Sequence, residues 1–314
     1  MRILLASPRG FCAGVNMALQ SLCVAVSKFD KQSVYVYNEI VHNSRVVQHY
    51  VDLGVRFVQS LDDVPEFSVL MFSAHGVSSE VRREAERKSL HIIDATCPLV
   101  FQVHRAVQRY ASKGFHVIYI GHPGHEEVVG TVGEAQRHIT VISSESDVQA
   151  LVENRSPNYF ELKLACLMQT TLSVTQTRQI VEVLKRHFPN IEVPEKGICY
   201  ATQNRQEAVC QLAKLSDFAL VVGSANSSNS CRLREIAEQQ GIPSRLIDGA
   251  EEIELSWFSG KETLLLTAGA SAPEYIVQAC IKRLQDVFEV AVEEVVTCDE
   301  HVVFPLPGEV RARS

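Results

Sequence analysis

Short apolar runs alternate with amphipathic stretches along the whole chain, and small or polar residues follow almost every run. The apolar residues 3–6 are followed by SPRGFCAG, residues 34–37 by NEIVHN, and residues 69–72 by SAHG. Short β-branched runs separated by stretches of helical period are typical of α/β proteins with mainly parallel strands. We therefore predict an α/β fold of mainly parallel sheets, in which most strands lead directly into a helix.

The polar clusters after the apolar runs predict a shared ligand site. In open parallel sheets, ligands bind beyond the carboxyl ends of the strands, where the N-termini of helices also point. Helix capping alone accounts for many of the Ser, Thr, Asn and Gly residues found there. It does not account for histidines and cysteines at equivalent ends, so we expect these ends to converge on one central site. The repeated order of elements suggests several small α/β units, although no clean sequence repeat accompanies it.

The cysteines divide into core residues and thiols that are available for chemistry. Their number, nine, is odd and no secretory signal precedes them, which argues against a disulfide framework. Four lie in apolar contexts and are predicted to be core residues: Cys23, Cys166, Cys210 and Cys280. Three others lie near strand–helix junctions, in GFCAG, ATCPL and ICYAT: Cys12, Cys97 and Cys199.

Thiolates at such junctions suit an iron–sulfur cluster or zinc. The chain has no C-x-x-C pair, which disfavours a zinc ribbon or finger. Three thiolates would leave one iron of a cluster open, so that it could act as a Lewis acid as well as an electron carrier. Gly10 and Gly14 flank Cys12, and we expect these glycines to leave room for a bulky group beside the thiol.

Three histidines also follow apolar runs, at small or polar turns: His42, His75 and His125. A single histidine is usually structural, but three in equivalent positions favour a shared anion or a metal. Imidazoles helped by helix amides and hydroxyls suit a diphosphate. The stretch HEEVV is not a zincin helix, because Val129 stands where the second histidine would be. Beside His125, either Glu126 or Glu127 could be a general acid, or both could be favourable charges in the first turn of a helix.

Two polar loops could hold phosphate oxygens. Residues 223–230 (GSANSSNS) and 268–273 (AGASAP) supply backbone N–H groups and hydroxyls in a form that can surround an anion. The alternative is that each is an ordinary serine-rich capping loop. The chain contains neither G-x-x-x-x-G-K-[ST] nor G-x-G-x-x-G, so an ATPase or a nicotinamide-binding protein loses its main support.

Composition narrows the class of protein without changing this interpretation. The 314 residues are 46% hydrophobic and carry a formal net charge of -7, which argues against a nucleic-acid binder with a broad basic face. No apolar stretch approaches the length of a membrane span, and we expect no signal peptide because the apolar run after Met1-Arg2 is too short for one. We expect a cytoplasmic protein that binds neither nucleic acid nor membrane.

Taken together, nine stretches resemble the 4-hydroxy-3-methylbut-2-enyl diphosphate reductase family. They are PRGFCAGV, EIVHN, FSAHGVS, DATCPLV, GHPGHEEVVGT, QTTLS, ICYAT, VVGSANSSNS and TAGASAP. The resemblance extends in order over residues 2–307 and implies three α/β units in a pseudo-threefold arrangement around a central cluster. The implied units are residues 14–97, residues 98–193, and residues 194–281 with the N-terminal strand 1–13, while residues 282–314 form a tail that closes the units.

The resemblance also implies a role for each candidate residue. A [4Fe–4S] cluster would be held by the three thiols Cys12, Cys97 and Cys199, with one iron left open. The substrate diphosphate would be bound by His42, His75, His125, Thr170, Ser227, Ser228, Asn229 and Ser271. Glu127 corresponds to the acid of the family, and Thr170 or Thr171 to its hydroxyl relay.

The implied reaction is the reductive dehydroxylation of (E)-4-hydroxy-3-methylbut-2-enyl diphosphate to isopentenyl and dimethylallyl diphosphate, with a ferredoxin or flavodoxin as electron donor. This is the last step of the methylerythritol phosphate pathway. A non-enzymatic iron–sulfur redox sensor that binds an anion is the alternative, but it gives no reason for the acid, the threonines and the loops. A zinc hydrolase would need a compact ligand set that the sequence lacks. Two positions depart from the family pattern: Glu126 replaces its usual proline, and Cys231 stands where asparagine is common.

Overall fold

The computed structural model describes residues 1–153, 162–195 and 197–311, and the chain forms two compact units. The first unit comprises Met1–Leu19, Val41–Gly54 and Tyr200–Pro305. The second comprises Gln20–Ile40, Val55–Cys199 and Leu306–Ser314. The described residues form three sheets, and every pair of neighbouring strands in them is parallel, which confirms the predicted fold class.

The first unit contains a five-stranded sheet of order β10-β9-β11-β1-β12. Its strands are β1 (Arg2–Ser7), β9 (Phe218–Val222), β10 (Ser244–Ile247), β11 (Thr263–Ala268) and β12 (Ala291–Val296). Its helices are α2 (Ser44–Asp52), α8 (Tyr200–Ala213), α9 (Ser228–Gln239), α10 (Glu274–Gln285) and the first turns of α1 (Ala13–Lys28). Strand β1 lies inside the sheet, because Leu4 pairs with Leu265 on one side and with Glu293 on the other.

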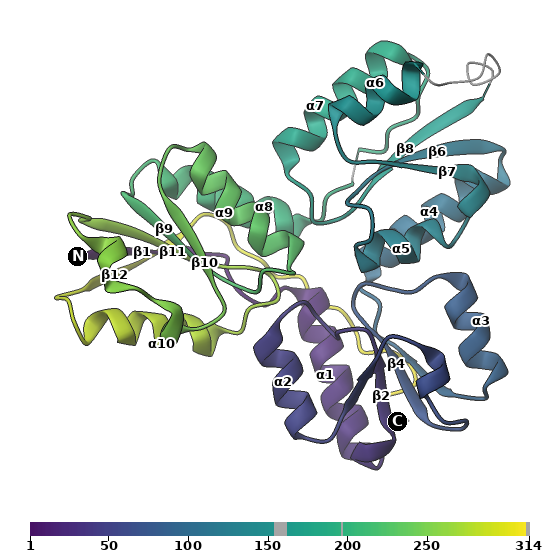
Figure 1. The fold of residues 1–314 in the computed structure, drawn as a ribbon, viewed down its shortest axis with the longest axis horizontal. Coiled ribbons are helices and arrows are strands. Elements are labelled where there is room, and N and C mark those ends of the chain that lie inside the picture. The colour runs from purple at the N-terminus through teal and green to yellow at the C-terminus, as the bar shows by residue number, and fades with distance from the viewer. Residues whose placement is uncertain (154–161, 196, 312–314) are drawn as a thin grey trace. The chain divides into compact units, whose positions relative to one another are not determined.

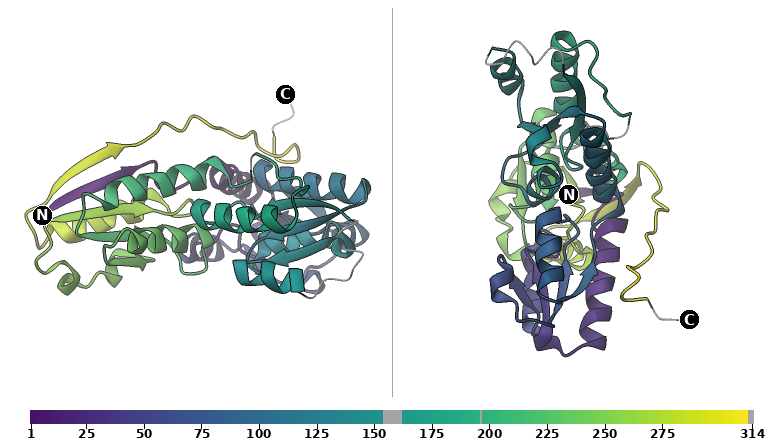
Figure 2. Two further views of the ribbon diagram at one scale, coloured as in Figure 1. Left: turned by 90° about the horizontal axis from the view of Figure 1, so that it is seen from above. Right: turned by 90° about the vertical axis from the view of Figure 1, so that its right-hand side faces the viewer.

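Alternation along β1 gives this sheet two apolar faces. Ile3 and Leu5 belong to the cluster that α10 covers, whereas Leu4 and Ala6 belong to the cluster covered by α8 and α9. Figure 1 shows the same arrangement, with α8 and α9 on one side of the strands and α10 on the other. Side chains of successive strand residues point to opposite faces, so a continuous apolar run is what such a buried strand requires. Figure 2 shows β12 running beside β1 at the edge of the sheet.

The second unit contains two smaller sheets, of order β3-β2-β4-β5 and β7-β6-β8. Their strands are β2 (Val34–Tyr37), β3 (Arg56–Val58), β4 (Val69–Phe72), β5 (His91–Asp94), β6 (Phe115–Ile120), β7 (Ile139–Ile142) and β8 (Lys163–Met168). The helices are α3 (Ser79–Arg87), α4 (Pro98–Ser112), α5 (Glu126–Val132), α6 (Glu145–Glu153), α7 (Val174–His187) and the rest of α1. In Figure 1, α6 and α7 cover one face of the three-stranded sheet, and α4 and α5 cover the other.

Two of the three sheets draw all their strands from one segment that the sequence predicts as a unit, and the third draws four of its five strands from one. Strands β2–β5 fall within residues 14–97 and β6–β8 within residues 98–193, while β1 and β9–β11 fall within residues 1–13 and 194–281. Strand β12 comes from the predicted tail. The division of the chain into three units stays a prediction.

Side-chain caps start several of the helices that follow strands. Asn43 Oδ1 accepts a hydrogen bond from the Val46 amide, and Ser78 Oγ accepts one from the Val81 amide. The capping interpretation of the polar clusters therefore holds at these positions. Among the described residues, no helix combines the length and the apolar character needed to cross a membrane.

The predicted core cysteines do not all lie in the core. Cys166 and Cys280 are buried, and Cys210 is half-buried, but Cys23 is exposed on α1. Its neighbour Leu22 is fully buried, and consecutive residues of a helix point about 100° apart. The apolar residues around Cys23 predicted that it is buried, but in α1 the buried position is that of Leu22 and Cys23 faces outward.

Candidate active site

Glu127 is buried in the second unit and held by one threonine. It lies in the first turn of α5 with only 2% of its surface exposed. Thr170 follows β8, and its backbone N–H donates to Glu127 Oε1 at 2.7 Å while its hydroxyl donates to Oε2 at 2.9 Å. Both carboxylate oxygens are thus fixed by one residue of the loop that follows β8.

Burial sets the protonation of this carboxyl group. Burial raises the pKa of Glu127 from its ordinary value to about 7. The two hydrogen bonds from Thr170 and the charge of His104 lower this pKa, but their effect is smaller than that of burial. A carboxylic acid with a pKa near neutrality carries a proton that it can give to a leaving group. Of the two candidate glutamates, Glu127 has the environment of a general acid.

The two threonines of QTT have different surroundings. The Thr170 hydroxyl donates to Glu127, whereas the Thr171 hydroxyl accepts a hydrogen bond of 3.0 Å from the Gln169 amide. Gln169 in turn accepts from the His122 backbone N–H at 3.0 Å. Sequence reasoning missed Gln169, although its place directly after an apolar run put it in the same class as the residues it selected.

His75 and His125 lie edge to face in the second unit, with ring centroids 6.1 Å apart. His125 caps α5, and its Nδ1 accepts a hydrogen bond of 3.1 Å from the Glu127 backbone N–H. Because Nδ1 is an acceptor, the proton of neutral His125 is on Nε2, where it can be donated to an anion. Burial lowers the pKa of His75 to about 4, with the charge of Glu39 acting in the opposite direction.

In the first unit the two predicted phosphate loops lie against each other. Asn229 Oδ1 accepts from the Ala270 backbone N–H at 2.8 Å, and the Ser271 hydroxyl lies 3.4 Å from that of Ser227. The Ser271 hydroxyl also donates to the His42 carbonyl at 2.8 Å. Ser227 caps α9, while Ser228 is the first residue of that helix and is half-buried. The structure thus brings together all the predicted binding residues of this unit.

Ser230 is a second residue that sequence reasoning missed. Its Oγ atom leaves no room for a side chain on either of two glycines. A Cβ on Gly223 would lie 2.2 Å from this oxygen, and a Cβ on Gly269 would lie 2.0 Å from it. Its hydroxyl also donates to Ser227 Oγ at 3.0 Å. The glycines that open the two loops are therefore required by this close packing.

The three predicted cluster ligands share one local arrangement. Each comes directly before a helix: Cys12 before α1, Cys97 before α4 and Cys199 before α8. Their thiols are half-buried. Within its own unit each backbone N–H is bonded to a loop of candidate residues, to Ala270, Ala74 and Thr170 respectively, over 3.2, 3.0 and 3.1 Å.

These thiols fit a cluster better than those of Cys166, Cys280 and Cys231 do. Amides and the dipole at a helix N-terminus favour negative charge, and a thiolate-ligated cluster carries it. In contrast, burial raises the pKa of the Cys166 and Cys280 thiols to about 12, which keeps both protonated. Burial also raises the pKa of Cys231, in keeping with a packed substitution.

Gly10 is required by a neighbouring loop, and its expected role in leaving room beside the Cys12 thiol stays a prediction. Its φ is +63°, and a Cβ placed there would approach the Ala272 carbonyl oxygen to 3.1 Å. Its N–H also bonds to the Ala268 carbonyl at 3.2 Å. The glycine therefore makes room for the neighbouring loop, because a left-handed conformation and a close backbone contact both exclude a side chain.

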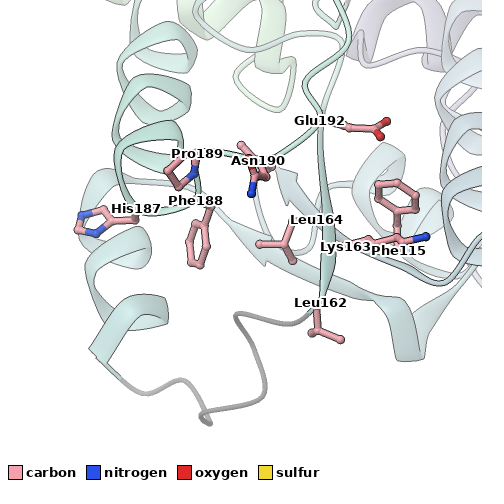
Figure 3. A pocket seen from close by; sticks show the side chains of 10 residues that line it. Phe115, Leu162, Lys163, Leu164, His187, Phe188, Pro189, Asn190 and Glu192 are labelled. Carbon is pink, nitrogen blue, oxygen red and sulfur yellow. The ribbon is translucent and has the colours of Figure 1, made fainter.

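A separate hollow in the second unit contains no predicted site residue. It has a volume of about 530 Å³ and lies at the amino ends of β6 and β8, whereas Glu127 and Thr170 lie beyond the carboxyl ends (Figure 3). Its lining is mostly apolar, with Lys163, His187 and Glu192 at its margin.

The fold and the site together define a class: a parallel α/β protein that places a buried acid and histidines beyond its strands, and cysteine thiols at the starts of its helices. Comparison with known proteins makes this specific. A sequence model described as LytB protein matches residues 3–285, and the chain belongs to this family.

Curated relatives cover the chain almost completely. A 4-hydroxy-3-methylbut-2-enyl diphosphate reductase of Rhodopirellula baltica is 49% identical over 99% of this chain and 96% of its own. That of Magnetococcus marinus is 49% identical over 99% and 100%. The solved E-1-hydroxy-2-methyl-but-2-enyl-4-diphosphate reductase of Plasmodium falciparum is 35% identical, covers 98% of this chain and 96% of its own, and superposes with a TM-score of 0.93.

Proposed function

We propose that this chain catalyses the reductive dehydroxylation of (E)-4-hydroxy-3-methylbut-2-enyl diphosphate to isopentenyl and dimethylallyl diphosphate. A similar solved structure, 29% identical with a TM-score of 0.64, is described as the terminal enzyme of the non-mevalonate pathway. The observation that carries the proposal is the buried Glu127, held through both oxygens by Thr170, in a chain so similar to named reductases.

Cys12, Cys97 and Cys199 are the residues that would hold a [4Fe–4S] cluster and leave one iron open. When bound, the cluster supplies two electrons, one at a time, and a Lewis-acid position for the substrate hydroxyl. A helix begins directly after each of the three cysteines, and this supports the assignment. The dipole at the N-terminus of a helix favours the negative charge of a thiolate. The electron donor is a ferredoxin or flavodoxin, and the protein is cytoplasmic.

The diphosphate is bound by His42, His75, His125, Ser227, Ser228, Asn229 and Ser271, with Thr170 near the reacting end. The hydrogen bonds among Asn229, Ala270, Ser227 and Ser271 hold two loops in position before the ligand arrives. Such preorganisation avoids an entropic cost of ordering these loops on binding. The Nε2–H of His125 is directed by its bonded Nδ1 and donates to the anion.

Glu127 supplies the proton for the leaving group. The C–O bond of the allylic alcohol breaks, the oxygen takes the proton from Glu127 through the Thr170 hydroxyl, and water leaves. Two electrons and a second proton complete the reduction, so that ROH, two electrons and two protons give RH and water. Protonation at either end of the allylic system gives the two products. Glu127 then recovers its proton from solvent.

Anaerobic purification with iron and sulfide analysis, Mössbauer spectra and a turnover assay tests this proposal. We expect four irons per chain as a [4Fe–4S] cluster, one iron site that changes when the diphosphate is added, and formation of both products. Cys12→Ser should lower the iron content, while the exposed Cys23→Ser is a matched control that keeps it. Stoichiometric zinc without sulfide would contradict the cluster, and a cluster without turnover would favour the redox sensor.

A further inference from the structure

His104 lies on the buried face of α4, at a position where an apolar residue would be usual. The other buried residues of this helix are Val100 and Val107, and only 4% of the surface of His104 is exposed. Its imidazole packs against two glycines of the second unit. A Cβ on Gly76 would lie 3.2 Å from the Cε1 atom of the ring and 3.3 Å from Nε2, and a Cβ on Gly130 would lie 3.4 Å from Cε1. The ring therefore fills a narrow space that these glycines leave open.

The Nδ1 edge of the ring pairs with a second buried side chain. His104 Nδ1 lies 3.0 Å from Glu134 Oε1, and 5% of the His104 side chain and 7% of that of Glu134 are exposed. The other carboxylate oxygen, Oε2, accepts a hydrogen bond from the side-chain amide of Gln108. Both oxygens of Glu134 thus act as acceptors, as they do in an ionised carboxylate, so the proton between the two groups is on Nδ1.

The burial of Glu134 gives a reason for a positive charge on this ring. A carboxylate that is removed from water is costly unless a cation lies beside it, and the imidazole of His104 is in that place. At the opposite edge, Nε2 is buried and has no hydrogen-bond partner among the described residues. The negative charge of Glu134 therefore balances one edge of the ring, while the other edge faces the interior of the unit.

Glu127 lies within reach of this charge. It precedes Gly130 by three residues on α5, so the two residues lie on the same face of that helix, one turn apart. The contact between the imidazole and Gly130 therefore places His104 beside the turn that carries the acid. Burial raises the pKa of Glu127, and the hydrogen bonds from Thr170 and the charge of His104 act in the opposite direction.

We propose that His104 is a positioning residue for Glu127: Glu134 holds it as an imidazolium, and its charge stabilises the carboxylate that remains when Glu127 gives its proton to the leaving oxygen. His104 keeps its own protons throughout. This inference rests on the proposed function, since it takes Glu127 as the acid. It also explains Gly76 and Gly130, because a side chain on either would crowd the ring.

The other ionisable groups of the neighbouring elements are compatible with this role. Tyr119 on β6 is fully buried, and burial and the charge of Glu127 raise the pKa of its phenol well above the ordinary value, so it stays neutral. Burial lowers the pKa of His75, in the loop after β4, to about 4, so this ring is neutral near pH 7. Glu126 on α5 lies against His75, and Arg105 on α4 is exposed.

Two substitutions remove the positive charge by different routes. His104→Gln removes the imidazole and keeps an amide that can donate to Glu134. Glu134→Gln leaves the imidazole in place and removes the carboxylate that holds its charge. Arg105→Gln is the matched control, because it removes an exposed positive charge from the next residue of the same helix.

The experiment is an infrared pH titration of the oxidised holoenzyme, which follows the C=O stretch of the protonated Glu127 carboxyl group. The band that Glu127→Gln removes identifies this group. We expect a midpoint at about 7 in the unsubstituted protein and in Arg105→Gln. In His104→Gln and in Glu134→Gln the midpoint should be about one pH unit higher, because a carboxylate without a nearby cation holds its proton more tightly. The descending limb of kcat against pH should move in the same direction.

The double variant should shift the midpoint no further than either single variant, because both substitutions remove the same charge. The sign of the Glu134→Gln shift separates this inference from direct repulsion between the two carboxylates. If Glu134 acted on Glu127 directly, its removal would move the midpoint to lower pH, and this result would overturn the inference. An unmoved midpoint in either single variant would overturn it as well, and Glu134→Gln decides alone if His104→Gln does not fold. None of these results would affect the proposed function, which fails separately if the unsubstituted holoenzyme forms no product.

Discussion

At the scale of single residues, two adjacent glutamates differ in their surroundings, and this difference identifies the candidate acid. Glu126 and Glu127 are equivalent in sequence, since both follow His125 at the start of a helix. Consecutive helical residues point about 100° apart, so one of them is buried against Thr170 and the other reaches His75. Sequence alone could not decide which, because that depends on the strand that packs beside the helix.

Glu127→Gln should abolish most turnover while keeping the cluster and substrate binding. An amide cannot supply the proton, and loss of a general acid lowers kcat by about 10²–10⁴-fold. The measurement is kcat under reducing conditions, with iron content and substrate Kd as controls. If Glu126→Gln lost kcat to the same extent while Glu127→Gln retained it, the assignment of the acid would be wrong.

The raised pKa of Glu127 predicts a pH dependence of turnover. The acid must be protonated to act, so kcat should be maximal below about 7 and fall about tenfold per pH unit above it. A profile that stays flat up to pH 9 would exclude this group as the titrating acid.

Thr170→Val tests whether the hydrogen bond from the Thr170 hydroxyl to Glu127 affects this pH profile. It removes the hydroxyl bond that lowers the pKa of Glu127, so the descending limb should move about one unit toward higher pH while kcat falls. Thr171→Val is the comparison, and it should leave the limb in place because that hydroxyl bonds to Gln169. Equal shifts in both variants would contradict a specific role for Thr170.

At the scale of elements, the period of the apolar runs predicted the fold well. Short continuous apolar runs became buried parallel strands, and the clusters after them became caps and loops at one end of each sheet. Close backbone approaches could not be predicted in the same way. Gly10 faces Ala272, and Gly223 and Gly269 enclose Ser230, because loops distant in sequence pack together. Such contacts leave no local signal beyond the glycine itself.

Gly269→Ala should destabilise the first unit and weaken substrate binding. The added methyl would lie 2.0 Å from the Ser230 hydroxyl and 3.0 Å from its Cβ, so that hydroxyl must rotate and lose its bond to Ser227, or the loops must separate, at a cost of about 1–3 kcal/mol. Urea unfolding and KM report the two effects. Gly308→Ala is the control, since a Cβ there meets nothing within 4 Å, and the two variants should differ clearly in unfolding midpoint.

At the scale of the whole molecule, one buried arginine joins three distant parts of the first unit. Arg205 on α8 donates to the Gly10 carbonyl at 2.8 Å and forms an ion pair with Glu300 at 3.0 Å. Only 1% of its side chain is exposed. The turn before Cys12 and the segment after β12 are thereby tied to the same helix, a connection that no local pattern in the sequence indicates.

Arg205→Leu should lower the free energy of unfolding by about 3–5 kcal/mol, because Glu300 is left without this charge and the Gly10 carbonyl loses a donor. Urea unfolding of the purified protein measures the loss. The double variant Arg205→Leu/Glu300→Leu should recover part of it, since no unpaired carboxylate remains. A purely additive double variant would indicate that the two charges are not coupled.

The place of β1 between β11 and β12 has a consequence for how the protein is made. Strand β1 pairs with two strands that are synthesised much later, since the partners of Leu4 are Leu265 and Glu293. Until β11 has been synthesised, β1 and the Cys12 turn have no sheet to join, whereas the strands of the second unit pair with neighbours closer in sequence. Closure of the first unit, and with it the correct presentation of Cys12, must therefore wait until β11 and β12 have been made.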